Sequence, residues 1–240
     1  MAKVVYWCIP NTAYHLNFAE PEPLLNDIMI LRNSVTSVDI SSDIIRCPAV
    51  HAVSHNVFVL RSPIDISFTI SDDAITTKDY NQNIFNQLFA VRDIKAGFLS
   101  LTMMESFFFT EEDCNMIVSG AYLANNDAAR YLSVIPGMFN IAKWFRNIDF
   151  AFFVRDKNKE VQIKTGDPLI YLRFDCKDPI VFKKFYCTNT ISEISRTVIG
   201  QKVFQADKSI TRYLPTIYSL FNKSKIKTKL LNEIKNNLME

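Results

Sequence analysis

Most of the chain up to about residue 187 consists of short apolar runs rich in β-branched and aromatic residues, each bounded by turn-forming residues. Such runs, recurring roughly every ten residues, are typical of consecutive antiparallel strands. The stretches that we assign to strands are 3–9, 56–62, 65–71, 97–110, 114–123, 145–156, 161–174 and 179–187. This succession predicts a mainly β protein of the α+β class, with an antiparallel β-sandwich or a jelly-roll-like barrel at its centre.

The segment TGDP interrupts the seventh of these runs and predicts a sharp corner or bulge. Gly166 can adopt a left-handed backbone conformation, Asp167 can bond to nearby backbone, and Pro168 needs a position without a ladder N–H. The polar segment DKNK at 156–159 predicts a hairpin turn just before this run. We expect adjacent antiparallel strands over 161–187, with one alternating apolar set facing the core: Ile163, Leu169, Tyr171 and Phe174, or their alternates.

The pattern changes from strands to helices after residue 187. Thr190 followed by Glu193 forms a capping box, which predicts the start of a helix. Further helical stretches are expected at 207–221 and 224–239. The last of them has a single apolar face made of Ile226, Leu230, Leu231, Ile234 and Leu238.

One helix is also expected inside the strand-rich part, at about 78–91. Its apolar residues share one side: Tyr80, Ile84, Leu88 and Phe89. The chain therefore divides into an antiparallel β core over 1–187 and C-terminal helices over 188–240. We expect those helices to pack on the core or on a partner copy, since an apolar face left in water would be an unusual exposed patch.

The sequence of 240 residues is 48% hydrophobic and 22% charged, which is the balance of a folded protein. Its formal net charge of +2 is too small to indicate nucleic-acid binding. No apolar run is long enough to cross a membrane. The cysteines are odd in number and form no C-x-x-C pair, so we expect reduced thiols in an intracellular protein: Cys8, Cys47, Cys114, Cys176 and Cys187.

The stretch CPAVHAVSH places a cysteine and two histidines at intervals of four. On a helix each interval rises about 6 Å, so Cys47 and His55 lie too far apart to bind one ion. Only His51 and His55 could share a metal, and Asn56 with the β-branched run after it predicts that the helix stops there. We therefore expect no metal site, with Cys47 near the N-cap and Pro48 at the first helical position.

Several enzyme classes lack their sequence signatures in this chain. It has no P-loop and no G-x-G-x-x-G turn, so nucleotide chemistry and a bound cofactor are not indicated. It has no G-x-S-x-G elbow and only three histidines, which argues against a Ser-His-Asp hydrolase. Cupins and iron oxygenases hold their metal through H-x-D, H-x-E or H-x-H pairs, and none of these occurs. The sequence identifies no catalytic residues.

Charged side chains concentrate in two segments. The stretch MMESFFFTEEDC carries carboxylates that a glycosidase would need across a cleft, although a solvated turn is the favoured interpretation: Glu105, Glu111, Glu112 and Asp113. The C-terminal stretch KSKIKTKLLNEIKNN carries lysines opposite its apolar face, and we interpret them as the solvated side of a docked helix. The aromatic runs SFFFT and DFAFF are interpreted as the two-sided core of a covered sheet rather than as a ligand pocket.

The chain resembles an uncharacterised protein group of large tailed bacteriophages that infect marine cyanobacteria. Four stretches carry the resemblance, in this order: RCPAV, NVFVLRSPIDI, VIPGMFNIAKWFRNIDFAF and IKTGDPLIYLRF. The resemblance covers about residues 1–235. It implies a phage-encoded protein made in the bacterial cytoplasm and located there or in the virion. It implies no particular activity.

Two classes of function remain open. The first is a non-enzymatic binding, assembly or host-interaction protein, with a protein partner or a second copy bound through the C-terminal helix. The second is a jelly-roll-type enzyme that acts on a small molecule, anchored by one of the arginines Arg46, Arg61, Arg146, Arg155 and Arg173. The missing catalytic signatures favour the first class, and nucleic acid is not an expected partner.

Overall fold

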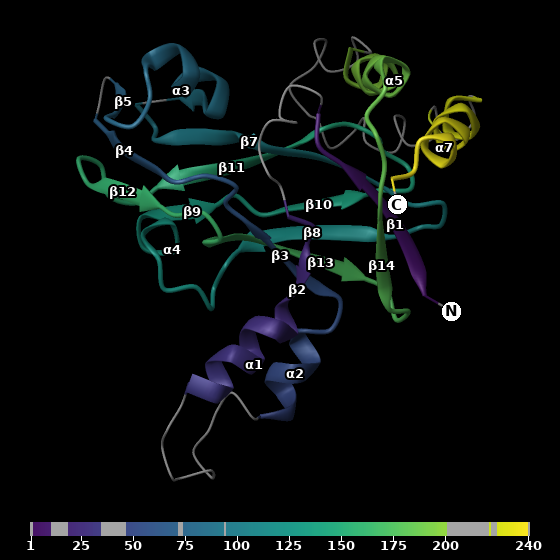
Figure 1. Ribbon diagram of the computed structural model, residues 1–240, viewed down its shortest axis with the longest axis horizontal. Helices are drawn as coiled ribbons and strands as arrows, with labels where there is room; N and C mark the ends of the chain where they lie inside the picture. Colours follow the sequence, from purple (N-terminus) through teal and green to yellow (C-terminus); the bar gives the residue numbers. More distant parts are fainter. Residues whose placement is uncertain are drawn as a thin grey trace.

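The strands assemble into two large sheets that pack face to face, with a smaller sheet at one end (Figure 1). The computed structural model describes residues 2–10, 19–34, 47–71, 74–93, 95–200, 221 and 225–239. The protein is mainly β and belongs to the α+β class, with a β-sandwich at its centre and a helix near its C-terminus. The fold class predicted from the sequence is confirmed.

The first large sheet is built around the long strand β7 (Phe98–Phe109). Strand β6 (Ala90–Asp93) pairs with one end of β7 and lies off the main path of the sheet. The N-terminal strand pairs antiparallel with the other end of β7 and in parallel with β14. The order of the main path is β14 (Ile180–Lys184), β1 (Lys3–Cys8), β7, β11 (Ile148–Val154) and β9 (Leu132–Val134).

The second large sheet is antiparallel throughout. Its order is β10 (Gly137–Asn140), β8 (Asn115–Gly120), β13 (Pro168–Asp175), β3 (Val57–Arg61) and β2 (Glu22–Pro23). The small sheet contains β12 (Glu160–Ile163), β4 (Ile66–Ile70) and β5 (Ile75–Thr77). These strands close one end of the sandwich (Figure 1).

The two large sheets share one apolar core between them, and each also buries part of its outer face. In the SFFFT run, Phe108 points into the shared core while Phe107 and Phe109 join a second cluster outside the first sheet. In β13, Leu172 belongs to the shared core and Tyr171 to a third cluster outside the second sheet. The predicted two-sided burial is therefore confirmed for SFFFT, but it is wrong for DFAFF, in which Phe150 and Phe152 are buried and Phe153 is 40% exposed.

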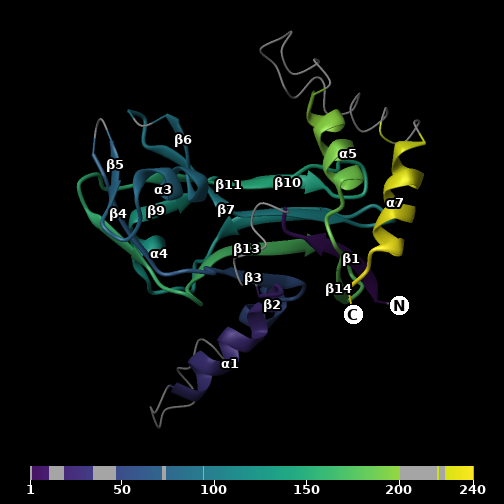
Figure 2. The same ribbon diagram turned by 45° about the horizontal axis from the view of Figure 1, so that its top comes forward.

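Helices supply the cover on both outer faces (Figures 1 and 2). Helix α1 (Leu24–Ser34) lies on the outer side of the second sheet through Leu24 and Ile28. The outer side of the first sheet is covered by α5 (Asn189–Gly200) and α7 (Ile226–Asn236) through buried Ile191, Leu230 and Ile234. The remaining described helices are α2 (Pro48–Val53), α3 (Gln82–Leu88) and α4 (Asp127–Tyr131).

The predicted pairing around residues 156–187 was wrong. DKNK does not connect a hairpin, because β11 pairs with β7 and β9 whereas β12 pairs with β4. The strands of 161–187 are not neighbours either: β13 lies between β3 and β8, and β14 runs parallel to β1. Turn residues mark where the chain changes direction, but the choice of neighbouring strand depends on contacts distant in sequence. Of the residues expected to face the core, Ile163, Leu169 and Phe174 do so, whereas Tyr171 is buried on the outer side of the second sheet.

Two predicted helix positions also need correction. The helix expected at about 78–91 covers only Gln82–Leu88, because the Asn81 side chain caps it by accepting from the Ile84 N–H, and Ile84 itself is exposed. The predicted capping box is wrong, since α5 begins at Asn189 and its cap is the Thr188 hydroxyl, which accepts from the Ile191 N–H at 3.2 Å.

The helix predicted at 207–221 lies outside the described residues, apart from Phe221, which is buried. Several short elements had no counterpart in the sequence prediction, namely α1, α4, β2, β5, β6, β9 and β10. Among the described residues, no helix has both the length and the apolar character needed to span a bilayer.

Candidate functional site

The stretch CPAVHAVSH forms the short helix α2, with Cys47 at the N-cap and Pro48 at its first position. The helix ends at Val53, and Asn56 then adopts a left-handed conformation with φ 52°. His55 is exposed and its Nε2 lies 3.3 Å from the Lys177 carbonyl oxygen. In the described part of the chain, no group of three or more histidines, cysteines, aspartates and glutamates is placed to hold a metal ion. All five cysteines are free thiols.

The acidic stretch after β7 is engaged by lysines from three parts of the chain. Glu111 forms an ion pair with Lys235 of α7 at 2.8 Å. Glu112 lies 3.4 Å from the Lys3 ammonium, and Asp113 pairs with Lys143. The two charged segments noted in the sequence therefore meet in space, and these carboxylates serve to connect the chain termini to the loop after β7.

Glu111 is the centre of this group. Its carboxylate also accepts a hydrogen bond from the Tyr6 hydroxyl at 3.1 Å. The Lys235 ammonium and this hydroxyl hold the pKa of Glu111 below its usual value, against the opposing effect of partial burial. Burial, together with the nearby carboxylate, raises the pKa of Tyr6 to about 12. Both effects favour an ionised Glu111 with a neutral Tyr6, which is a structural arrangement rather than an acid and base poised near neutral pH.

Among the arginines proposed as anchors, most are occupied or lie on the outer surface. Arg61 donates to Glu22 at 2.8 Å and also pairs with Asp27. Arg146 lies over the Trp144 ring, 5.6 Å from its centroid, and Arg173 is exposed on β13. Arg46 lies outside the described residues. Arg155 is the arginine of this group that reaches a cavity without a carboxylate partner among the described residues.

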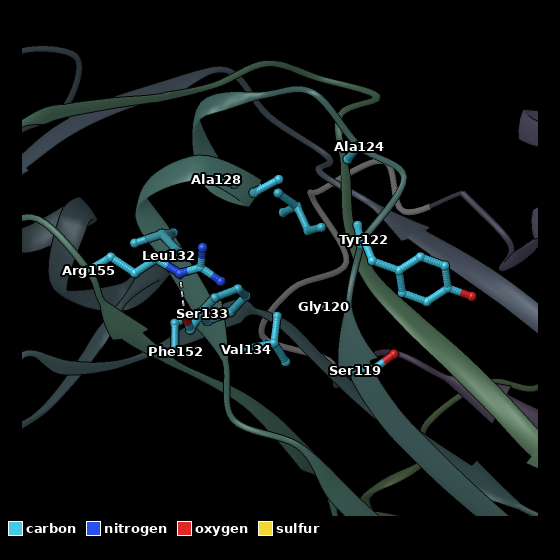
Figure 3. A pocket seen from close by; sticks show the side chains of 13 residues that line it. Ser119, Gly120, Tyr122, Ala124, Ala128, Leu132, Ser133, Val134, Phe152 and Arg155 are labelled. Atoms are coloured by element: carbon cyan, nitrogen blue, oxygen red, sulfur yellow. Dashed lines mark hydrogen bonds between the residues drawn. The ribbon is translucent and has the colours of Figure 1, made fainter. Parts of the chain in front are cut away.

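The cavity at Arg155 has a volume of about 460 Å³ and lies where β8, β9 and α4 come together (Figure 3). Its wall is made mostly of small and aliphatic residues: Gly120, Ala121, Ala124, Ala128, Ala129, Leu132, Val134 and Leu169, with Phe152. Polar side chains are Ser119, Tyr122, Ser133 and Arg155. The described lining contains no histidine, cysteine, aspartate or glutamate, so Tyr122 is its one side chain of an acid–base type and no second such group lies beside it.

Arg155 is an exposed residue that is held in place at the open edge of this cavity. Its backbone N–H donates to the Tyr131 carbonyl at 2.8 Å, and its Nε donates to the Ser133 hydroxyl at 2.5 Å. Figure 3 shows the guanidinium and Ser133 on one side of the cavity and Tyr122 on the other, with its hydroxyl directed away from Arg155. One end of the cavity is therefore cationic, and the rest of its wall is small and aliphatic with Ser119 and Tyr122 as polar exceptions.

A second concave surface of about 490 Å³ lies beside α1. Apolar side chains line much of it, including Ile30 and Leu31 of α1. The turn predicted from TGDP borders it: Gly166 has φ 86°, the Asp167 carboxylate accepts from the Lys164 N–H at 2.9 Å, and Pro168 begins β13. Arg61 links this turn to α1, because it donates to the Gly166 carbonyl at 3.2 Å while it pairs with Asp27.

The outer side of α1 is unusually apolar for an exposed helix. Relative exposures are 41% for Leu25, 52% for Met29, 66% for Ile30 and 36% for Leu31. Leu24 and Ile28 of the same helix are fully covered by the second sheet. Apolar residues thus lie all around α1, a distribution that is typical of a helix covered on more than one side.

Sequence reasoning missed both concave surfaces. The run SGAYLANNDAA, which supplies much of the Arg155 cavity, has an unusual density of small residues, and this density was the available signal. The run LLNDIMIL was a detectable apolar stretch, but it lacks the periodicity that identifies an amphipathic helix. The contact of Arg155 with Ser133 depends on the pairing of β9 with β11, which no local pattern encodes.

Comparison with known proteins gives no relative from which a role could be transferred. No protein-family model, no curated protein and no solved structure matches the chain.

Proposed function

We propose that the protein is a non-enzymatic assembly protein in which α1 pairs with the α1 helix of a second copy. The observation that carries this proposal is the exposure of Leu25, Met29 and Ile30 on a helix that already buries Leu24 and Ile28. Exposed apolar side chains concentrated on one short element are characteristic of a contact surface. Covering them removes apolar area from water, which is the main favourable term in protein association.

A second copy suits this face because its described side chains carry little unpaired charge. Among them, the exposed polar residues are Asn26 and Asn33, which are uncharged. Asp27 is already paired with Arg61, and the side chain of Arg32 is outside the described part of the helix. The described parts of two identical faces can therefore meet around a two-fold axis without bringing like charges together, and two-fold dimers are the commonest form of homo-oligomer.

The C-terminal helix suits this role less well than the sequence indicated. Its apolar residues Leu230 and Ile234 are fully buried by its own chain. Its exposed side carries Lys229, Asn232 and Lys235, so a partner that bound α7 would meet charged and amide groups. We therefore place the proposed partner contact on α1.

Tyr122 has no histidine, cysteine or carboxylate beside it in the described lining of the Arg155 cavity, which supports a non-enzymatic role over the jelly-roll enzyme. The resemblance to phage proteins supports a phage source, with the protein acting in the host cytoplasm or in the virion. Mass spectrometry of purified particles of the encoding phage separates these two locations. Stoichiometric amounts in the particle support the virion, and absence from it supports the cytoplasm.

The assembly proposal is tested by sedimentation velocity over a concentration series. We expect the parent protein to dimerise and Ile30→Lys to raise the dimer dissociation constant by about thirtyfold or more, because a buried charge opposes association at a contact centre. Val181→Lys is the matched control, since Val181 is an exposed apolar residue, 45% accessible, on the distant strand β14. A parent protein that stays monomeric at all concentrations, or equal effects of the two variants, contradicts the proposal.

A further inference from the structure

We propose that the cavity at Arg155 binds a small aliphatic carboxylate, with its acid group on the Arg155 guanidinium and its hydrocarbon part against the wall formed by α4, β8 and β9. This site is separate from the α1 face. The proposal depends on three features: a cation held in place, a wall made mostly of small and aliphatic residues, and the absence of competing acids in the described lining.

The Arg155 guanidinium is held in one orientation by a neighbour that bonds only one of its three nitrogens. Among the described residues only Ser133 bonds it, and this bond uses Nε. Both terminal nitrogens are therefore left to donate to a ligand. A guanidinium edge with two parallel N–H groups matches the two oxygens of a carboxylate, which makes the bond both strong and directional.

The wall opposite this cation suits saturated hydrocarbon. Ala128, Leu132 and Leu169 are buried residues that border the cavity, and Phe152 closes it from β11. Gly120 keeps the wall open, because a Cβ at that position would lie 3.4 Å from a methyl of Val134. A volume of about 460 Å³ is in the range of pockets that hold small organic ligands.

The charge count favours a monoanion. Arg155 is the single charged side chain in the described lining. Asp127, the acid on α4, pairs with Arg130 at 3.8 Å and accepts from the Gln162 N–H at 3.3 Å, and the exposed Asp156 next to Arg155 is not among the lining residues. One guanidinium balances one carboxylate, whereas a phosphate dianion would keep a net negative charge beside an apolar wall, which is costly.

Octanoate and octan-1-ol are suitable probes, because they share one chain and differ in charge. We expect octanoate to bind and to shift the amide NMR signal of Gly120 while leaving that of Gly97 unchanged, since Gly97 lies outside the cavity lining. Octanol should bind more weakly. Failure of octanoate to bind the parent protein at millimolar concentration overturns the proposal, as does binding that shifts Gly97 but leaves Gly120 unchanged.

Two variants separate the cation from the apolar wall. Arg155→Gln should weaken octanoate about tenfold or more and leave octanol unchanged, because it removes a charged hydrogen-bonding group. Arg173→Gln, which removes an exposed arginine outside the cavity, is the matched control and should change neither affinity. Ala129→Leu fills the cavity from a partly exposed helix position and should weaken both probes. Equal octanoate affinities for Arg155→Gln and Arg173→Gln, measured on folded protein, contradict the assignment.

Discussion

Helices α1 and α7 cover opposite outer faces of the sandwich by the same means and differ in what they leave in water. Each buries two aliphatic side chains completely, Leu24 and Ile28 in α1 and Leu230 and Ile234 in α7. The exposed side of α7 is made of lysines, asparagines and a threonine, whereas that of α1 includes Leu25, Met29 and Ile30. Packing against the sandwich covers the buried apolar residues of α7 and leaves polar side chains in water. The same packing leaves a second set of apolar side chains of α1 exposed to water.

Helices α1 and α7 are also attached to the sandwich by different interactions. Helix α7 is tied to the acidic loop by Lys235 and to the sheet by an isolated bridge between Phe185 and Leu238. Helix α1 is tied to the second sheet by Arg61, whose charge is shared between Glu22 and Asp27. The comparison predicts that substitutions in α7 mainly change stability, while substitutions on the outer side of α1 mainly change association.

The largest expected effect comes from a substitution inside α7. Leu230→Ala should lower the free energy of unfolding by about 2–5 kcal/mol, because it leaves a cavity in a fully buried cluster. Ile30→Ala in α1 is the paired control and should change the monomer's stability by less than about 0.5 kcal/mol. Urea denaturation at low protein concentration measures both. Similar losses for the two variants would show that the outer side of α1 is not a free surface of the monomer.

An intermediate effect is expected at the turn next to α1. Gly166 has φ 86° and open space around its missing Cβ, so only backbone conformation opposes a side chain there. Gly166→Val should cost about 1–3 kcal/mol, because a β-branched residue strongly disfavours the left-handed region. Gly166→Asn is the control, since asparagine tolerates that region better and should cost clearly less. Thermal melting distinguishes them, and equal melting temperatures would mean that the turn adopts another conformation in solution.

The smallest effect is expected at the ion pair that connects α7 to the loop after β7. Glu111→Gln should cost only about 0–1 kcal/mol at neutral pH, because the pair is partly exposed. The pKa of Glu111 is lower in the folded protein than its usual value. The contribution of this carboxylate to folding stability is therefore fully present at pH values above the usual pKa, and it is lost as the pH falls through the lower pKa of the folded state.

The stability difference between the parent protein and Glu111→Gln should therefore shrink as the solution is acidified through that interval. Denaturation curves over a series of acidic pH values measure it, with Glu112→Gln as the control because Glu112 is much more exposed, at 79% of its side chain. A difference that grows on acidification would contradict the assigned role of Lys235.

Local patterns in the sequence were sufficient to locate most long strands. The runs that became β1, β3, β4, β7, β8, β11, β13 and β14 were all assigned correctly to strands, because β-branched and aromatic residues between turn residues report directly on local conformation. The helix that begins at Pro48, with Cys47 as its N-cap, was also placed correctly, since a proline at the first position fixes its start.

Contacts between distant residues could not be obtained in this way. The parallel pairing of β1 with β14 and the crossing of β12 to β4 depend on which apolar faces meet in the folded chain. The acidic stretch and the lysine tail were each visible in the sequence, but nothing in either segment showed that Glu111 and Lys235 would meet. The sequence offered five arginines as possible anchors. Arg155 differs from the others through its bond to Ser133 and the small residues around Gly120, and these become its neighbours only in the folded chain.

The parallel pairing of β1 with β14 sets the order in which the chain can complete its structure. Lys3 is matched with Ile180, a residue 177 positions later, so β1 can pair with β7 well before the strand on its other edge has been made. Until then the edge of β1 that faces β14 has no partner strand. Such long-range pairing makes folding slow and leaves an unpaired strand open to other chains during synthesis. The edge of β1 that awaits β14 is therefore a place where a partly folded chain can pair with another chain.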